Sequence, residues 1–240
     1  MTSSIEVISG DLVYRVLTYP IGSSKVITFV NPFSYQILDS RSELVSDIDY
    51  IFSDGSLFCF MHNICNKQNK ISRASFDYSS LAEPVFSFCE NNKLRVAFVG
   101  AEKSQLRLAL ENIKARHKNL DIAYSRNGFF KDTDEINQSL EEMALSNVDV
   151  VIVGMGTPMQ EEFSIQVKNK LPEGVLIFTC GGFLTQTSIR PDYYSPIIKK
   201  LGLRWLQRFV AHKHVRSRVL NDYPRFCYLY LKQNFRIRKH

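Results

Sequence analysis

The feature that most constrains the fold of this 240-residue chain is a pattern that occurs six times. Each time, an apolar run of strand length stops at a small or polar residue and is followed by a segment with helical periodicity. Strands that alternate with helices favour a mostly parallel sheet with right-handed crossovers. We therefore predict an α/β, Rossmann-like fold with helices on both faces of the sheet. The runs end at Asn31, Asp54-Gly55, Gly100, Gly128, Gly154 and Gly181-Gly182.

Two segments outside the six runs give local predictions. The early stretch "DLVYRVLTYP" is expected to form an edge strand or hairpin, because Pro20 ends it. Asp132 and Glu135 are spaced as a capping pair, and they predict a helix that runs to about Leu145.

The composition is that of a globular protein, with 45% hydrophobic residues. No apolar run approaches the roughly 20 residues of a membrane-spanning helix. The start "MTSSIEVISGD" lacks the basic and apolar regions of a signal peptide. Five cysteines without a Cys-x-x-Cys pair favour reduced thiols over disulfides or zinc. We expect a cytoplasmic protein without a metal ion.

The net charge of +6 is unevenly distributed along the chain. Between Lys199 and His240 there are twelve Lys and Arg residues and one acid, Asp222, so this segment has a net charge of +11. The first 198 residues have a net charge of −5. This division predicts a Rossmann-like catalytic body over residues 1–198 and a basic helical appendage over residues 199–240. An amphipathic basic tail with aromatic residues is typical of helices that bind an anionic membrane. A helix packed on the body with its charges in solvent is the structural alternative, and no nucleic-acid-binding module is recognisable in the body.

Several of the strand-ending residues are predicted to form one site. In open α/β sheets the ligand lies beyond the carboxyl ends of the strands. One crevice then collects Asn31, Asp54, Gln160 and Glu161. Asn, Asp and Gly also end strands simply because they favour turns, but the whole set favours a site.

Asp54 is the strongest candidate for chemistry. Because it follows the apolar run "DYIFS" and precedes Gly55, a sharp turn would present its carboxylate at the sheet edge. A partly buried carboxylate can serve as a general base there. The alternative is a structural role, in which Asp54 caps the helix "SLFCFMHNI".

Other motifs argue against nicotinamide-dependent chemistry and against P-loop phosphate chemistry. Gly154-x-Gly156 is followed by Pro158 and Met159, which breaks the dinucleotide fingerprint, and no Gly-Lys-Ser/Thr sequence exists. The loop still offers amides at a helix start, a general anion site. Asp47-Ile48-Asp49 resembles the Asp-x-Asp metal and nucleotide-sugar motif, but these acids open their strand and are expected at its amino end, away from the crevice.

Taken together, the motifs resemble those of the WecG/TagA/CpsF glycosyltransferases, enzymes of bacterial surface-polysaccharide and teichoic-acid assembly. The resemblance runs in order from about Asn31 to Pro224. The family's asparagine resembles Asn31 in "FVNPFSYQIL", its Asp-Gly resembles Asp54-Gly55, and its later arginine is similar to Arg73 in "ISRASFDY". Its Gly-x-Gly-x-Pro-x-Gln-Glu resembles "GMGTPMQE", and its Gly-Leu-x-Trp-Leu-x-Arg resembles "GLRWLQR".

The resemblance implies an inverting transfer, without metal or cofactor, from a UDP-sugar to a lipid-diphosphate-linked acceptor at the inner face of the cell membrane. The transferred group would be a hexose, an N-acetylhexosamine or a uronic acid. Asp54 would be the general base, and Asn31 and Gln160 would orient sugar or acceptor. The tail would dock on the membrane and bring arginines over the leaving diphosphate. The residues expected to bind substrate are Arg73, Gly100, Gly128, Phe129, Gly154, Gly156, Glu161, Gly181, Gly182, Arg208 and Arg218.

Three departures from the family's pattern leave the donor sugar open. Phe29 stands where many members of the family have threonine. The segment "GGFLTQTS" lacks the acid that follows the late Gly-Gly in the family, and it has Thr185 nearby. Arg204 stands where the family often has glutamate. The competing hypothesis is a non-catalytic nucleotide- or nucleic-acid-binding α/β protein that uses the same basic tail.

Overall fold

The structure, a computed structural model, describes residues 5–19, 21–189 and 216–237, with the backbone alone for residue 218 and residues 233–237. Its six strands form one sheet in the order β2-β1-β6-β5-β3-β4, and every pairing is parallel. The predicted α/β, Rossmann-like parallel sheet is therefore confirmed. The strands are β1 (Lys25–Val30), β2 (Tyr50–Ser53), β3 (Arg95–Gly100), β4 (Asp121–Arg126), β5 (Val150–Gly154) and β6 (Leu176–Thr179).

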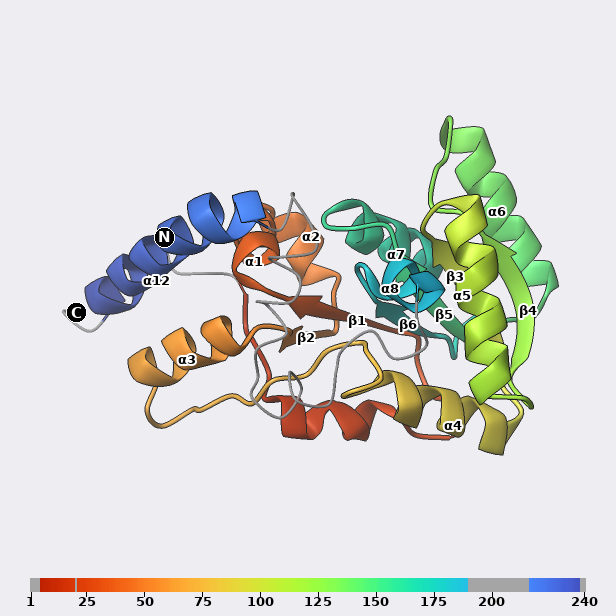
Figure 1. Ribbon diagram of the computed structural model, residues 1–240, viewed down its shortest axis with the longest axis horizontal. Coiled ribbons are helices and arrows are strands. Elements are labelled where there is room, and N and C mark those ends of the chain that lie inside the picture. Colours follow the sequence, from red (N-terminus) through yellow and green to blue (C-terminus); the bar gives the residue numbers. More distant parts are fainter. Residues whose placement is uncertain (1–4, 20, 190–215, 238–240) are drawn as a thin grey trace.

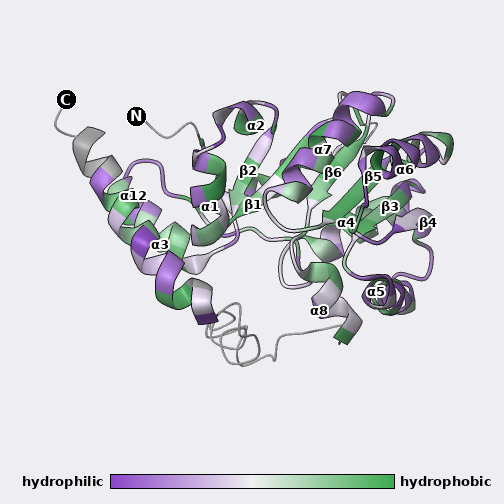
Figure 2. Cartoon of the chain, turned by 90° about the horizontal axis from the view of Figure 1, so that it is seen from above, coloured by the Kyte–Doolittle hydropathy of each residue, from purple (hydrophilic) through white to green (hydrophobic). Residues whose placement is uncertain are grey.

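Helices cover both faces of the sheet, and each face has its own hydrophobic core (Figures 1 and 2). Along β3, Ala97 and Val99 enter the core of the first face while Val96 and Phe98 enter the core of the second, as the two-residue period of a strand requires. The first face is covered by α1 (Pro32–Asp39), α2 (Ser42–Ser46), α3 (Ser56–Cys65), α6 (Thr133–Leu145), α7 (Met159–Lys170) and α12 (Tyr223–Ile237). The second is covered by η1 (Gly10–Val16), α4 (Ala82–Asn92), α5 (Lys103–Arg116) and α8 (Phe183–Ile189).

The connections after β1 and β6 create a crevice between these neighbouring strands. After β1 the chain turns into α1 on one face, and after β6 it turns into α8 on the other. Neighbouring parallel strands whose helices lie on opposite faces leave room between their carboxyl ends. The fold therefore places a candidate site beside Asn31 and Thr179.

The early segment forms a helix, so the prediction of an edge strand or hairpin is wrong. Gly10–Val16 is a 3₁₀ helix, η1, whose Val13 and Val16 are buried against the second face. The two valines are three positions apart, which matches the three residues per turn of this helix. Among the described residues of the early segment, Ile8, just before η1, forms an isolated bridge to Phe52 of β2.

The two other local predictions are confirmed. Asp132 caps α6 by accepting a hydrogen bond from the Glu135 amide at 2.9 Å, and the helix ends at Leu145. Asp49 lies at the amino ends of β1 and β2, where it accepts from the Val26 amide at 2.8 Å and pairs with Lys25 and Lys168. The Asp-x-Asp sequence thus has a structural role at the edge of the sheet opposite the crevice, where Asp49 links β1 to Lys168 of α7.

The end of the predicted appendage packs on the body. A π-helical turn, η2 (Arg218–Asp222), leads into α12, which lies beside α1 and α3 (Figure 1). Phe226 and Tyr230 of α12 are buried in the first core. Residues 190–215, with much of the predicted appendage, lie outside the described residues. Among the described helices, none combines the length and apolarity needed to cross a bilayer.

Candidate active site

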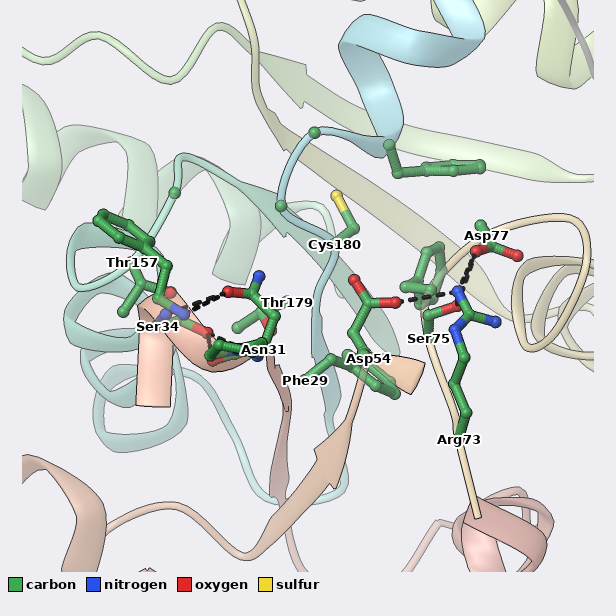
Figure 3. A pocket seen from close by; sticks show the side chains of 18 of the residues that line it. Phe29, Asn31, Ser34, Asp54, Arg73, Ser75, Asp77, Thr157, Thr179 and Cys180 are labelled. Carbon is green, nitrogen blue, oxygen red and sulfur yellow. Dashed lines mark hydrogen bonds and ion pairs between the residues drawn. The ribbon is translucent and has the colours of Figure 1, made fainter. Parts of the chain in front are cut away.

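A cavity of about 1120 Å³ opens at the carboxyl edge of the sheet. Its walls come from the loops after β1, β2, β5 and β6, from the loop before α4, and from η2 and the start of α12. Asn31, Asp54 and Arg73, predicted from distant parts of the sequence, line it (Figure 3). The predicted Gln160 lines it as well. The structure therefore brings the predicted catalytic residues and the predicted arginine to one place.

Asp54 is held at the end of β2 with its carboxylate in the cavity. Its backbone amide donates to the Val30 carbonyl at 2.8 Å. The alternative role as a helix cap does not apply, because Gly55 occupies the N-cap position of α3 and no side chain caps that end. Asp54 Oδ1 instead accepts from Arg73 Nη2 at 2.9 Å, and the Asp54 side chain keeps 27% of its surface exposed. A carboxylate that is partly exposed beside a cavity can accept a proton from a bound hydroxyl.

Arg73 contacts a second acid, Asp77, that our sequence analysis did not single out. Arg73 Nη2 lies 2.9 Å from Asp77 Oδ2 and also contacts the Ser75 hydroxyl. Burial acts to raise the pKa of Asp77, but the Arg73 charge and hydrogen bonds from Ser79 and Ser75 outweigh it and lower that pKa. The spacing of "RASFDYS", with serines two residues to each side of the acid, is the signal that could have revealed this cluster.

Asn31 is both a structural cap and a cavity residue. Its Oδ1 accepts from the amides of Phe33 at 2.9 Å and Ser34 at 3.2 Å, and the Ser34 hydroxyl completes a capping box at the start of α1. Because Oδ1 faces the helix, the carboxamide nitrogen is the end turned outward (Figure 3). Asn31 can therefore donate a hydrogen bond to a ligand without losing its cap.

Gln160 links two of the loops that form the cavity. Its Oε1 accepts from the Gly181 amide at 3.1 Å, and its Nε2 donates to Glu161 Oε1 at 2.9 Å. Glu161 is fully buried behind the wall, where its Oε1 also accepts from Thr28 and Thr157. Burial raises the pKa of Glu161. These contacts show Gln160 and Glu161 fixing the shape of the cavity; a direct role of either in binding sugar stays a prediction.

The predicted glycines divide into two groups. Gly154, Gly156, Gly181 and Gly182 line the cavity, where a glycine lets backbone and ligand approach closely. Gly100, Gly128 and Phe129 are not among the lining residues. A Cβ on Gly100 would lie 2.4 Å from the Gly154 carbonyl oxygen, so close backbone packing explains that glycine.

The roles predicted for the tail arginines stay predictions. Arg208 lies outside the described residues, and only the backbone of Arg218 is described, in η2. Within the described ranges, no group of three or more His, Cys, Asp or Glu residues is arranged as a metal site.

Comparison with known proteins agrees with the motifs. The sequence model of the glycosyl transferase WecG/TagA/CpsF family matches residues 6–240. The chain is 42% identical over 209 residues to a UDP-Gal:alpha-D-GlcNAc-diphosphoundecaprenol beta-1,4-galactosyltransferase of Shigella boydii, covering 87% of this chain and 86% of the relative.

More distant relatives carry a different transferase name. An N-acetylglucosaminyldiphosphoundecaprenol N-acetyl-beta-D-mannosaminyltransferase of Bacillus subtilis (strain 168) is 24% identical over 218 residues, 87% of this chain and 79% of the relative. A Staphylococcus aureus (strain NCTC 8325 / PS 47) protein of the same name is 25% identical over 198 residues, 82% and 74% of the two chains. With a family match over nearly the whole chain and a cavity that assembles the predicted catalytic residues, this protein belongs to the WecG/TagA/CpsF family and is a glycosyltransferase.

Proposed function

We propose that this enzyme transfers galactose from UDP-galactose to N-acetylglucosamine held on a polyprenyl diphosphate, with inversion and without a metal ion. The relative at 42% identity is named for this donor and acceptor. The relatives at 24–25% identity are named for a different transferred sugar but for the same N-acetylglucosaminyl-diphospho-lipid. The names of all three relatives support this acceptor. Galactose as the transferred sugar is supported by the relative at 42% identity.

The observation that carries the proposal is the Asp54–Arg73 pair at the edge of the cavity. As the acceptor hydroxyl oxygen forms a bond to the anomeric carbon, the bond from that carbon to UDP breaks and its electron pair leaves with the diphosphate. Asp54 takes the hydroxyl proton. A single displacement of this kind converts the α linkage of UDP-galactose into a β linkage, so the transfer inverts.

The departing diphosphate needs positive charge, and the amino end of α3 offers part of it. This end faces the cavity through Ser56 and Leu57, and its N-cap residue, Gly55, provides no side-chain cap. Exposed amides at helix amino ends favour anions, and such preorganised donors stabilise charge that develops in a transition state. We propose that Arg208 and Arg218 of the tail add to this positive charge, and that Arg73, which contacts Asp54, binds substrate on the acceptor side.

The lipid-linked acceptor places the reaction at a membrane. We propose that residues 1–198 are the catalytic body and that residues 199–240 bind the inner face of the cell membrane and close the site. The basic surplus of the tail suits anionic lipid head groups. The comparisons do not favour the alternative of a non-catalytic nucleotide- or nucleic-acid-binding protein.

The test is transfer to a synthetic acceptor, an alkyl diphosphate that carries α-linked N-acetylglucosamine. Wild-type protein, with EDTA present, is expected to release UDP and form a disaccharide with UDP-galactose faster than with UDP-glucose or UDP-N-acetylmannosamine. Asp54→Asn should lower kcat by at least roughly 100-fold, the usual range for loss of a general base. Asp47→Asn is the matched control, because Asp47 is an exposed acid near the opposite end of the same strand.

Each part of the proposal can fail separately. Transfer of another sugar would overturn the donor, and a need for divalent metal would overturn the metal-free step. Near wild-type turnover by Asp54→Asn would remove Asp54 from the role of base. No transfer from any UDP-sugar would overturn the proposed function itself.

A further inference from the structure

The second carboxylate in the cavity wall, Asp77, has no role in the proposal above. We propose that Asp77 is a positioning residue that holds the Arg73 guanidinium against Asp54, an inference that rests on the proposed function. Asp77 reaches the wall from the loop before α4, whereas Asp54 reaches it from the end of β2 (Figure 3).

The contacts of one nitrogen carry the inference. Arg73 Nη2 lies 2.9 Å from Asp54 Oδ1 and 2.9 Å from Asp77 Oδ2, with the Ser75 hydroxyl beside it. An arginine side chain has many rotamers and loses conformational entropy when it is fixed. Two carboxylates on different loops restrict the guanidinium more than Asp54 alone does.

The backbone of Arg73 is already fixed, so its side chain is the part that needs holding. The Ala74 amide donates to the Ser53 carbonyl at 2.9 Å, and the Gly10 amide donates to the Ser72 carbonyl at 3.0 Å. Gly10 packs so closely that a Cβ there would lie 2.5 Å from the Arg73 carbonyl carbon. η1 and β2 thus hold the main chain on both sides of Arg73.

The two oxygens of Asp77 have separate tasks. Oδ1 accepts from the Ser79 amide at 2.7 Å and from the Ser79 hydroxyl, which closes a local turn. Oδ2 accepts from Arg73 and, at 2.7 Å, from the Ser75 hydroxyl. The Asp77 side chain is 15% exposed, against 27% for Asp54. The more buried acid is therefore the anchor, and the more exposed acid is the one a substrate can reach.

This division allows the two tasks to be tested apart. Asp77→Asn keeps an oxygen for the Ser79 amide but replaces Oδ2 by an NH₂ group that cannot accept from Arg73. Ser79→Ala weakens the turn and leaves Oδ2 in place, so it is the matched control. Misplacement of a catalytic constellation by about 1 Å costs on the order of 100-fold.

We expect Asp77→Asn to lower kcat for sugar transfer by roughly 10- to 100-fold, with the acceptor KM nearly unchanged. The Tm should fall, because the Asp77 carboxylate stabilises the fold through Arg73 and the serines, so kcat is compared at a temperature where both proteins are folded. Ser79→Ala should keep nearly the wild-type kcat. In an Arg73→Ala background, adding Asp77→Asn should cost nothing further, because residues that act through one another are not additive.

Three results would overturn the inference. They are wild-type kcat in Asp77→Asn, equal losses in Asp77→Asn and Ser79→Ala, and additive losses in the double variant. If Arg73→Ala turns over too slowly to measure, the comparison of Asp77→Asn with Ser79→Ala decides alone. A wild-type enzyme that transfers no sugar would instead contradict the proposed function, so the two failures are distinguishable.

Discussion

Glu161 is fully buried at the start of α7 and is the residue whose environment is least expected for its type. Its Oε1 accepts hydrogen bonds from Thr28, Thr157 and Gln160, whereas its Oε2 has no hydrogen-bond partner among the described residues. Thr28 in turn lies 2.8 Å from the Thr179 hydroxyl, and Thr179 lines the cavity. The acid therefore ties α7 to β1 and β6 at the cavity floor, at a cost that depends on its protonation.

The sign of that dependence follows from burial, which raises the pKa of Glu161 above its ordinary value of 4.5. The unfolded chain then releases this proton at a lower pH than the folded protein does. As pH rises above about 4.5, the folded state holds more protons than the unfolded state, so this group makes the protein less stable. The loss continues until the folded protein also releases the proton.

We predict that Glu161→Gln removes this loss. Relative to wild type, the variant should gain stability as pH rises from about 4.5, with a limiting slope of about 1.4 kcal/mol per pH unit for one proton. Denaturant unfolding at several pH values measures the difference. Glu162→Gln, at the half-exposed neighbouring position that pairs with Arg41, is the control. A Glu161→Gln difference that stays constant from pH 4 to 8 would contradict the prediction.

At the scale of elements, the apolar runs predicted β1, β2, β3, β5 and β6 because these strands are buried on both faces. The edge strand β4 is only partly buried, and its sequence is less apolar. η1 was mispredicted because Val13 and Val16 suit several conformations, and only the surface they pack against decides between them. Asp77 was missed for a related reason. Its proposed role depends on a contact with Arg73 and on the approach of that loop to β2. The local spacing of the serines indicates the turn around Asp77 but not these two long-range contacts.

The attachment of α12 to the body can be tested through one aromatic side chain. Phe226 is 1% exposed and packs against Phe58 of α3 and Tyr35 of α1, with ring centroids 5.4 and 5.7 Å apart. We predict that Phe226→Ala lowers the free energy of unfolding by about 3–5 kcal/mol, the usual cost of removing a buried aromatic ring. Urea unfolding measures this change.

A matched variant on the same helix separates packing from helix propensity. Tyr228 is 64% exposed, so Tyr228→Ala should change the unfolding free energy little. Because Tyr223, Pro224 and Cys227 line the cavity, Phe226→Ala should also reduce transfer. Equal destabilisation by the two variants would show that α12 is not held by its buried face.

At the scale of the whole molecule, the sequence indicated the sheet edge that carries the site and four of its principal residues, Asn31, Asp54, Arg73 and Gln160. The resemblance implied that the tail closes over the site, but the sequence did not indicate that η2 and α12 form a wall of the cavity. The described part of the appendage is both basic and partly buried in the body, through Phe226 and Tyr230. The division of the chain at residue 198 stays a prediction.

The proposed membrane contact is best tested by changing charge without removing packing. Deleting the tail would also remove Phe226 and Tyr230 from the core, so loss of binding after truncation would have two explanations. Arg216, Arg225 and Lys232 are exposed on the described part of the tail. We predict that replacing all three with glutamate weakens binding to vesicles that contain phosphatidylglycerol by at least roughly 100-fold, because each basic residue near such a surface contributes about 1 kcal/mol.

The control must reverse the same amount of charge elsewhere on the protein. Lys103, Lys118 and Lys170 are exposed on the body, and their replacement by glutamate changes the net charge equally. If the tail provides the contact, the control triple should co-sediment with vesicles nearly as wild type does, and added salt should weaken wild-type binding. If both triples lose binding equally, net charge rather than the tail governs association. If neither loses binding, the membrane contact is not electrostatic, and the basic surplus of the tail must serve the diphosphate alone.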